Sequence, residues 1–128
     1  MQYRMMSGKI HRATVTEANL NYIGSITIDQ DLLDASGFLP QEMVQITNLA
    51  NGEFWQTYII PGPRGRGDIC LNGPPARKFH PGDLVIIIGF RLYEESELAD
   101  YHSSVVFVDE KNRVTEVSRT ESPFVERG

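Results

Sequence analysis

The chain has 128 residues, a formal net charge of −5 and 41% hydrophobic residues, which is enough for one domain with a hydrophobic core. A net acidic chain lacks the basic surface that attracts nucleic acids and anionic membranes, so we expect neither as a partner. The single cysteine, Cys70, excludes an intramolecular disulfide, and its apolar neighbours predict a buried side chain rather than a nucleophile. No signal segment or membrane-spanning run is visible, and we expect a cytoplasmic protein.

The first third of the chain predicts two strands and a short helix. Residues 3–16 are rich in β-branched and long side chains without a helical stripe, and residues 25–28 alternate polar and apolar, so both segments predict strands. Residues 29–36 predict a helix with Asp29 as its N-cap and Gly37 as its stop.

The middle of the chain predicts a β-hairpin. Residues 43–49 and 54–60 both alternate, and Asn51 and Gly52 between them supply the turn. The Gly- and Pro-rich residues 61–67 predict a loop.

The last part predicts further short strands and small helices. Strands are predicted over residues 68–71, 84–90, 105–108 and 113–117, and short helices over residues 74–78 and 94–101. Residues 84–90 are apolar at consecutive positions, which predicts a strand buried on both faces. The many short strands with Gly/Pro turns predict a mainly β fold, a closed barrel over residues 1–117, followed by a flexible tail at residues 118–128.

Candidate chemistry concentrates near the N-terminus rather than around a metal. His11, His80 and His102 show no ligand spacing and no second cysteine exists, so no metal site is predicted. Lys9, His11, Tyr22, Gly24 and Ser25, in contrast, fall within 17 residues. Taken singly, each of these residues fits an ordinary strand or turn.

Joined to later motifs, this cluster resembles the bacterial aspartate 1-decarboxylases, which convert aspartate to β-alanine for pantothenate synthesis. The resemblance runs without gaps from about residue 5 to residue 117. It rests on GKIHR (8–12), YIGS (22–25), IDQDLLD (28–34), NG (51–52), TY (57–58), NG (72–73) and PGDLVI (81–86).

The resemblance implies a double-psi β-barrel with short peripheral helices, assembled as a homotetramer with active sites between protomers. It also implies a pyruvoyl cofactor made from Ser25. The chain would cut itself after Gly24 into residues 1–24 and 25–128, and the pyruvoyl carbonyl would form a Schiff base with an amino-acid substrate. A carbonyl electron sink is needed because no ordinary side chain accepts the electrons left on Cα when CO2 departs.

The family's residue roles carry over to matching positions of this chain. Gly24 would be the cleavage site, where a missing Cβ allows close approach of the Ser25 hydroxyl. Tyr58 would be the proton donor, and Thr57 would assist processing and bind substrate. The other expected substrate-binding residues are Lys9, His11, Tyr22, Asn72, Gly73, Pro74, Pro75 and Ile86.

Two departures from the family pattern leave the substrate open. Phe54 stands where the family typically has an arginine that clamps a carboxylate, and Pro74 and Pro75 stand where it has small alanines. Aspartate is the expected substrate of a carboxy-lyase with this pattern. The alternatives are a self-processing decarboxylase for another amino acid and a non-catalytic barrel that binds a small molecule or a protein.

Overall fold

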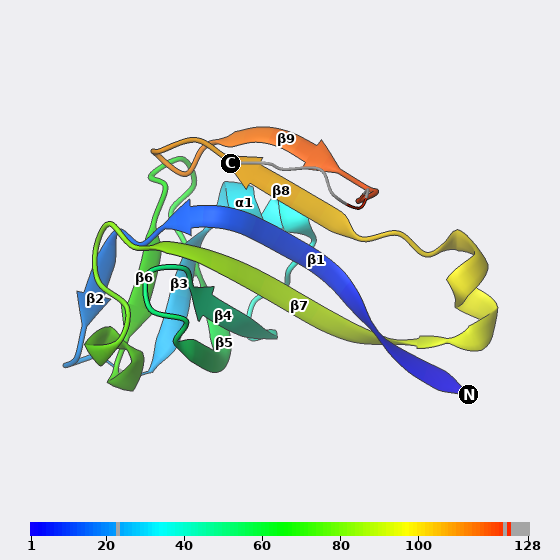
Figure 1. Ribbon diagram of the computed structural model, residues 1–128, viewed down its shortest axis with the longest axis horizontal. Helices are drawn as coiled ribbons and strands as arrows, with labels where there is room; N and C mark the ends of the chain where they lie inside the picture. The colour runs from blue at the N-terminus through cyan, green and yellow to red at the C-terminus, as the bar shows by residue number, and fades with distance from the viewer. Residues whose placement is uncertain (23, 122, 124–128) are drawn as a thin grey trace.

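The computed structural model describes residues 1–22, 24–121 and 123. The strands among these residues form one mixed sheet in the order β2-β6-β3-β5-β4-β7-β1-β8-β9 (Figure 1). The strands are β1 (Gln2–Thr14), β2 (Glu17–Asn19), β3 (Ser25–Asp29), β4 (Met43–Asn48), β5 (Phe54–Gly62), β6 (Ile69–Asn72), β7 (Leu84–Glu94), β8 (Ser104–Val108) and β9 (Val114–Ser118). The helices are α1 (Gln30–Ser36) and two 3-10 helices, η1 (Pro74–Arg77) and η2 (Glu95–Asp100).

The sheet wraps around one core, which confirms the mainly β prediction and agrees with a double-psi β-barrel. Every strand from β3 to β8, together with β1 and α1, contributes a fully buried aliphatic side chain to the same cluster. The hydrogen-bonded order nevertheless begins at β2 and ends at β9, so the sheet is open at its edges rather than closed as the pattern of short strands predicts. None of the described helices is long and apolar enough to span a membrane.

Burial alternates along the strands of the barrel wall. In β7, Val85 and Ile87 are fully buried, whereas Ile86 and Ile88 are only partly covered. The prediction that residues 84–90 are buried on both faces is therefore wrong for the single chain. The reason is that β4 and β1 flank β7 in the sheet, and the described residues leave its outer side partly open to solvent. The outer face is therefore apolar and only partly covered.

The caps of α1 are where the sequence predicts them. Asp29 accepts a hydrogen bond from the Asp31 backbone N–H (2.8 Å), and Gly37 ends the helix in the left-handed conformation with φ of 81°. The buried Asp29 carboxylate also accepts the N–H groups of Gly65 (3.1 Å) and Gly67 (2.6 Å). One side chain thus joins the end of β3, the start of α1 and the Gly-rich loop.

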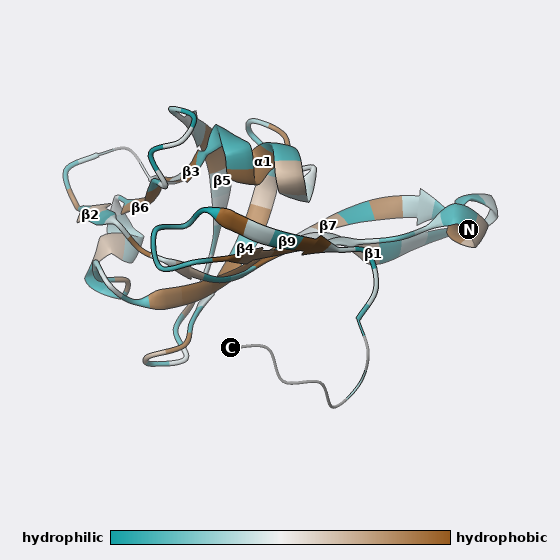
Figure 2. Ribbon diagram, turned by 90° about the horizontal axis from the view of Figure 1, so that it is seen from above, coloured by the Kyte–Doolittle hydropathy of each residue, from teal (hydrophilic) through white to brown (hydrophobic). Residues whose placement is uncertain are grey.

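A two-stranded arm extends beyond the barrel. The first residues of β1 pair with the last residues of β7, from Gln2 opposite Glu94 to Met6 opposite Phe90. Figure 2 shows this ribbon projecting from the body of the molecule with the N-terminus at its tip. The pairing register shifts at Ser7, where the arm enters the barrel.

Several predicted boundaries change because of tertiary pairing. β2 was not predicted, and it forms by pairing in parallel with β6. β5 extends to Gly62 inside the predicted loop, because Gly62 pairs with Asp29 of β3. The predicted helix over residues 94–101 is a 3-10 helix. Of the predicted tail, residue 118 ends β9, and residues 122 and 124–128 lie outside the described residues.

Replacing Asp29 tests its role as the joint between strand, helix and loop. We expect Asp29→Ala to lower the free energy of unfolding by about 2–3 kcal/mol, because hydrogen bonds to a charged group are worth ~1.5–3 kcal/mol. Urea unfolding followed by circular dichroism measures the change. Asp34→Ala is the matched control, since Asp34 is exposed and bonds to the side chains of Arg64 and Gln30, and the change should barely move the midpoint. Equal effects of the two variants would contradict the assignment.

Candidate active site

The peptide between Gly24 and Ser25 lies at the start of β3, at one end of the barrel. Ser25 is 5% exposed and pairs with Asn72 of the antiparallel strand β6. Residues directly opposite each other in an antiparallel pair share a face, so the Ser25 and Asn72 side chains lie on the same side of the sheet. Ile26 and Leu71, the next pair, lie on the core side.

The Asn72 side chain is buried beside Ser25 and is only partly satisfied. Its Nδ2 donates a long hydrogen bond to Thr27 Oγ1 at 3.5 Å, and its Oδ1 is buried with no partner among the described residues. An acceptor oxygen left unpaired in a buried site costs free energy unless another group uses it. The Asn72 Oδ1 atom can therefore accept a further hydrogen bond next to Ser25.

Gly24 lies against the turn that follows β6. An added Cβ on Gly73 would lie 2.7 Å from Gly24 Cα. Pro74, the first residue of η1, also faces Gly24. Pro75 is buried in the same short helix. Residues 72 to 75 are expected to bind substrate. The structure places them next to the proposed cleavage site.

Thr57 and Tyr58 reach the site through the parallel pairing of β3 with β5. The pairing begins with Ile26 opposite Ile59, so Tyr58 and Thr57 lie on β5 just before the paired stretch, as Ser25 and Gly24 do on the side of β3. Successive side chains of a strand point to opposite faces. Tyr58 therefore shares the outer face with Ser25, whereas Thr57, 7% exposed, points inward.

Phe54 and Ile86 lie on the same outer face, farther along the wall. Phe54 pairs with Thr47, and Thr47 pairs with Ile86, so the three side chains form a row across β5, β4 and β7. Phe54 is 49% exposed. The row carries an aromatic ring and an aliphatic side chain, and no cation.

Lys9 and His11 are not brought to Ser25 within one chain. Both lie on β1, and β5, β4 and β7 stand between β1 and β3 in the sheet. Lys9 Nζ forms an ion pair with Glu121 (3.7 Å), and the His11 ring packs edge-on against Phe107 with centroids 5.6 Å apart. Lys9 and His11 therefore form a group on β1 that is separate from the residues around Ser25.

The backbone of Tyr22, rather than its ring, lies near the residues around Ser25. It ends the turn after β2, where its N–H donates to Asn19 O at 3.5 Å, and its carbonyl lies near Gly73. The Tyr22 side chain is 57% exposed. A ring so placed is available to line a pocket completed by another molecule.

Cys70 is buried on β6, opposite Thr27 of β3, in agreement with the expectation from its apolar neighbours. Burial raises the pKa of its thiol, and only a hydrogen bond with Thr16 opposes this effect. A thiol with a raised pKa is a poor nucleophile at neutral pH. Cys70 is therefore a packing residue.

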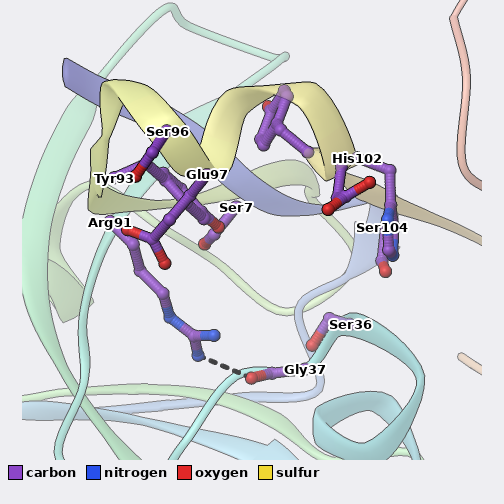
Figure 3. A pocket seen from close by; sticks show the side chains of 11 residues that line it. Ser7, Ser36, Gly37, Arg91, Tyr93, Ser96, Glu97, His102 and Ser104 are labelled. Carbon is purple, nitrogen blue, oxygen red and sulfur yellow. Dashed lines mark hydrogen bonds between the residues drawn. The ribbon is translucent and has the colours of Figure 1, made fainter.

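A polar cavity of about 540 Å³ lies elsewhere, between the arm, η2 and the end of α1. Figure 3 shows Ser7, Ser36 and Arg91 around it, with Arg91 donating to Gly37 O at 2.7 Å. None of the predicted catalytic and substrate-binding residues lines this cavity. Its residues come from segments far apart in the chain, so no local motif could have indicated it.

Comparisons with known proteins identify the family. The family model described as aspartate decarboxylase matches residues 1–115. Curated relatives named aspartate 1-decarboxylase include those of Carboxydothermus hydrogenoformans (60% identical over 91% of this chain and 92% of the relative) and Bacillus subtilis (55% over 91% and 92%). A third, from Shouchella clausii, is 54% identical over 94% of this chain and 95% of its own. With this agreement over nearly its whole length, and with Gly24, Ser25 and Asn72 gathered at one end of the barrel, the chain belongs to the aspartate decarboxylase family.

Proposed function

We propose that this protein is a pyruvoyl-dependent aspartate 1-decarboxylase that produces β-alanine and CO2. The observation that carries the proposal is a buried serine at the start of β3, next to a buried Asn72 oxygen that has no partner among the described residues, with Thr57 and Tyr58 on the adjoining strand β5. Family membership supports the same reaction. The buried, unpaired Cys70 is in keeping with a reducing, cytoplasmic environment.

Self-processing begins with Ser25. Its Oγ attacks the Gly24 carbonyl carbon, the C–N bond breaks, and the nitrogen takes up the proton, so the peptide becomes an ester. Elimination then releases the Gly24 carboxylate and leaves dehydroalanine, which adds water and loses ammonia to become the pyruvoyl group at position 25. Thr57, on the neighbouring strand β5, is the proposed donor to the carbonyl oxygen, and one such donor is typically worth ~10²–10³ in rate.

The residues around Ser25 fit such a group. A pyruvoyl carbonyl at position 25 would lie on the outer face beside Asn72, whose amide can hydrogen-bond it or the substrate. When present, this group withdraws the electrons that the departing CO2 leaves behind. Tyr58 shares the face of Ser25, and it is the proposed donor of the proton to the substrate carbon, a role worth ~10²–10⁴-fold.

Lys9, His11 and Ile86 are proposed to serve the site of a neighbouring protomer in a homotetramer. Within one chain Lys9 and Ser25 are separated by three strands, so they meet only if two copies face each other. The apolar outer face of β7, with Ile86, Ile88 and the 63%-exposed Leu92, supports burial against a second copy. In that arrangement the Lys9 ammonium binds a substrate carboxylate.

Phe54 favours a second candidate function, the same chemistry on a less acidic amino acid. Its exposed ring replaces a cation on the outer face, and Pro74 and Pro75 offer no N–H groups to a carboxylate. A third reading, a non-catalytic barrel that binds a small molecule or protein, requires an intact Gly24–Ser25 bond. Denaturing mass spectrometry and an activity assay on aspartate separate these functions.

Denaturing mass spectrometry tests self-processing. We expect the purified, aged protein to separate into residues 1–24 and a larger piece from position 25 that is blocked to Edman degradation. Ser25→Ala should give one intact mass, because it lacks the attacking hydroxyl. An uncut wild-type chain would favour the binding protein.

Activity on aspartate tests the substrate. We expect β-alanine from aspartate, and we expect Phe54→Arg to raise kcat/KM for aspartate by up to about fivefold, because position 54 is 49% exposed and an exposed ion pair is worth at most ~1 kcal/mol. Val114→Arg, which adds the same charge at an exposed position of β9 at the far edge of the sheet, is the control and should not change kcat/KM. A wild type that is processed but inactive on aspartate would point to the second candidate.

The Lys9–Glu121 ion pair predicts competition with substrate. Glu121→Gln should lower KM for aspartate by up to about fivefold, because a partly exposed pair is worth at most ~1 kcal/mol. Lys9→Met should raise KM instead. Glu110→Gln, at another exposed acid, is the control and should leave KM unchanged. A change of KM in the same direction for Glu121→Gln and Lys9→Met would contradict the prediction.

A further inference from the structure

Gly73 occupies a backbone conformation that other residues avoid. It links β6 to η1 with φ of 80° and ψ of −146°, a region populated almost only by glycine. Hydrogen bonds fix it on both sides, because its N–H donates to Asn19 O (2.8 Å) and its carbonyl accepts from Ala76 N (3.0 Å). The backbone at Gly73 is therefore a rigid surface.

That surface lies directly against the peptide to be cut. A Cβ on Gly73 would approach Gly24 Cα to 2.7 Å, Gly24 N to 3.0 Å and Tyr22 O to 3.2 Å. All three neighbours are backbone atoms, so no side-chain rotation relieves the clash. A Cβ on Gly24, in contrast, meets only Pro74 Cδ at 3.6 Å and Asn72 O at 3.8 Å, which are ordinary contacts. The tight contact between the two backbones therefore requires a glycine at position 73 rather than at position 24.

The contact matters because of what lies on either side of the scissile bond. Ser25 is held in β3 by its pairing with Asn72, so its backbone position and the face that its side chain occupies are set by the sheet. The carbonyl that this oxygen attacks belongs to Gly24, which precedes the strand and rests on Gly73 and Pro74. Reacting atoms must come within about 3–3.5 Å in the correct direction, and a misplacement of about 1 Å costs ~10²-fold.

We propose that Gly73 is a positioning residue for self-cleavage, and that its bare backbone sets the Gly24 carbonyl in the path of the Ser25 hydroxyl. The inference rests on the proposed function, since it concerns the same cleavage. It adds a role in maturation to a residue that the sequence analysis assigned only to substrate binding. Pro74, whose ring faces Gly24, completes the support.

The test compares Gly73→Ala with Gly82→Ala. Gly82 also has a positive φ, of 95°, but an added Cβ there meets nothing within 4 Å, so this control carries the backbone strain without the clash. Cleavage is followed from the newly synthesised chain by denaturing mass spectrometry, with and without hydroxylamine, which cuts the ester formed by the first step. We expect Gly73→Ala to form the ester at least ~10²-fold more slowly than wild type, and Gly82→Ala to match wild type.

The outcomes are distinct. A folded Gly73→Ala, judged by circular dichroism, that is cut or accumulates hydroxylamine-sensitive ester at the wild-type rate overturns the inference. If that variant does not fold, Pro74→Gly takes its place, because it removes the ring against Gly24 and adds no heavy atom. Slower ester formation in folded Pro74→Gly supports the inference, and a wild-type rate overturns it. Failure of the wild type and Gly82→Ala to cleave overturns the proposed function itself.

Discussion

The site depends on the double pairing of β3. This five-residue strand is held in parallel by β5 on one edge and antiparallel by β6 on the other. The two registers together determine which residues surround Ser25, because β6 supplies Asn72 directly opposite and β5 brings Tyr58 alongside. Side chains alternate between the faces of a strand, so a slip of one residue in either register would turn Ser25 into the core and dismantle the site.

Short-range signals predicted much of the fold. The Asn51-Gly52 turn with alternating flanks identified β4 and β5, and the capping residues Asp29 and Gly37 identified α1, because each of these features is written in adjacent residues. Segments shaped by distant partners were less accessible. β2 is three residues long and forms through its pairing with β6. The partial exposure of the outer face of β7 depends on how other segments pack in the folded chain, which the run of apolar residues does not reveal.

The candidate site divides in the same way. Family motifs indicated Gly24, Ser25, Thr57, Tyr58 and Asn72, and the structure brings these residues to one end of the barrel. No pattern in the sequence indicated that the tight contact lies at Gly73 rather than at Gly24, since it depends on two backbones that meet from segments about 50 residues apart. The separation of Lys9 from Ser25 by three strands was equally hidden, because strand order is a property of the folded chain.

The place of β1 in the sheet determines what the proposed self-cleavage would leave behind. β1 lies between β7 and β8, and β2 pairs with β6, so a cut after Gly24 leaves the short piece bonded along three strands. The two polypeptides would persist as one folded body, yet they would no longer be joined covalently. Denaturation would then disperse them, and refolding would require two molecules to meet instead of one chain to collapse. A protein cleaved in this way would not refold readily, so its lifetime would be set by the rate of unfolding rather than by an equilibrium.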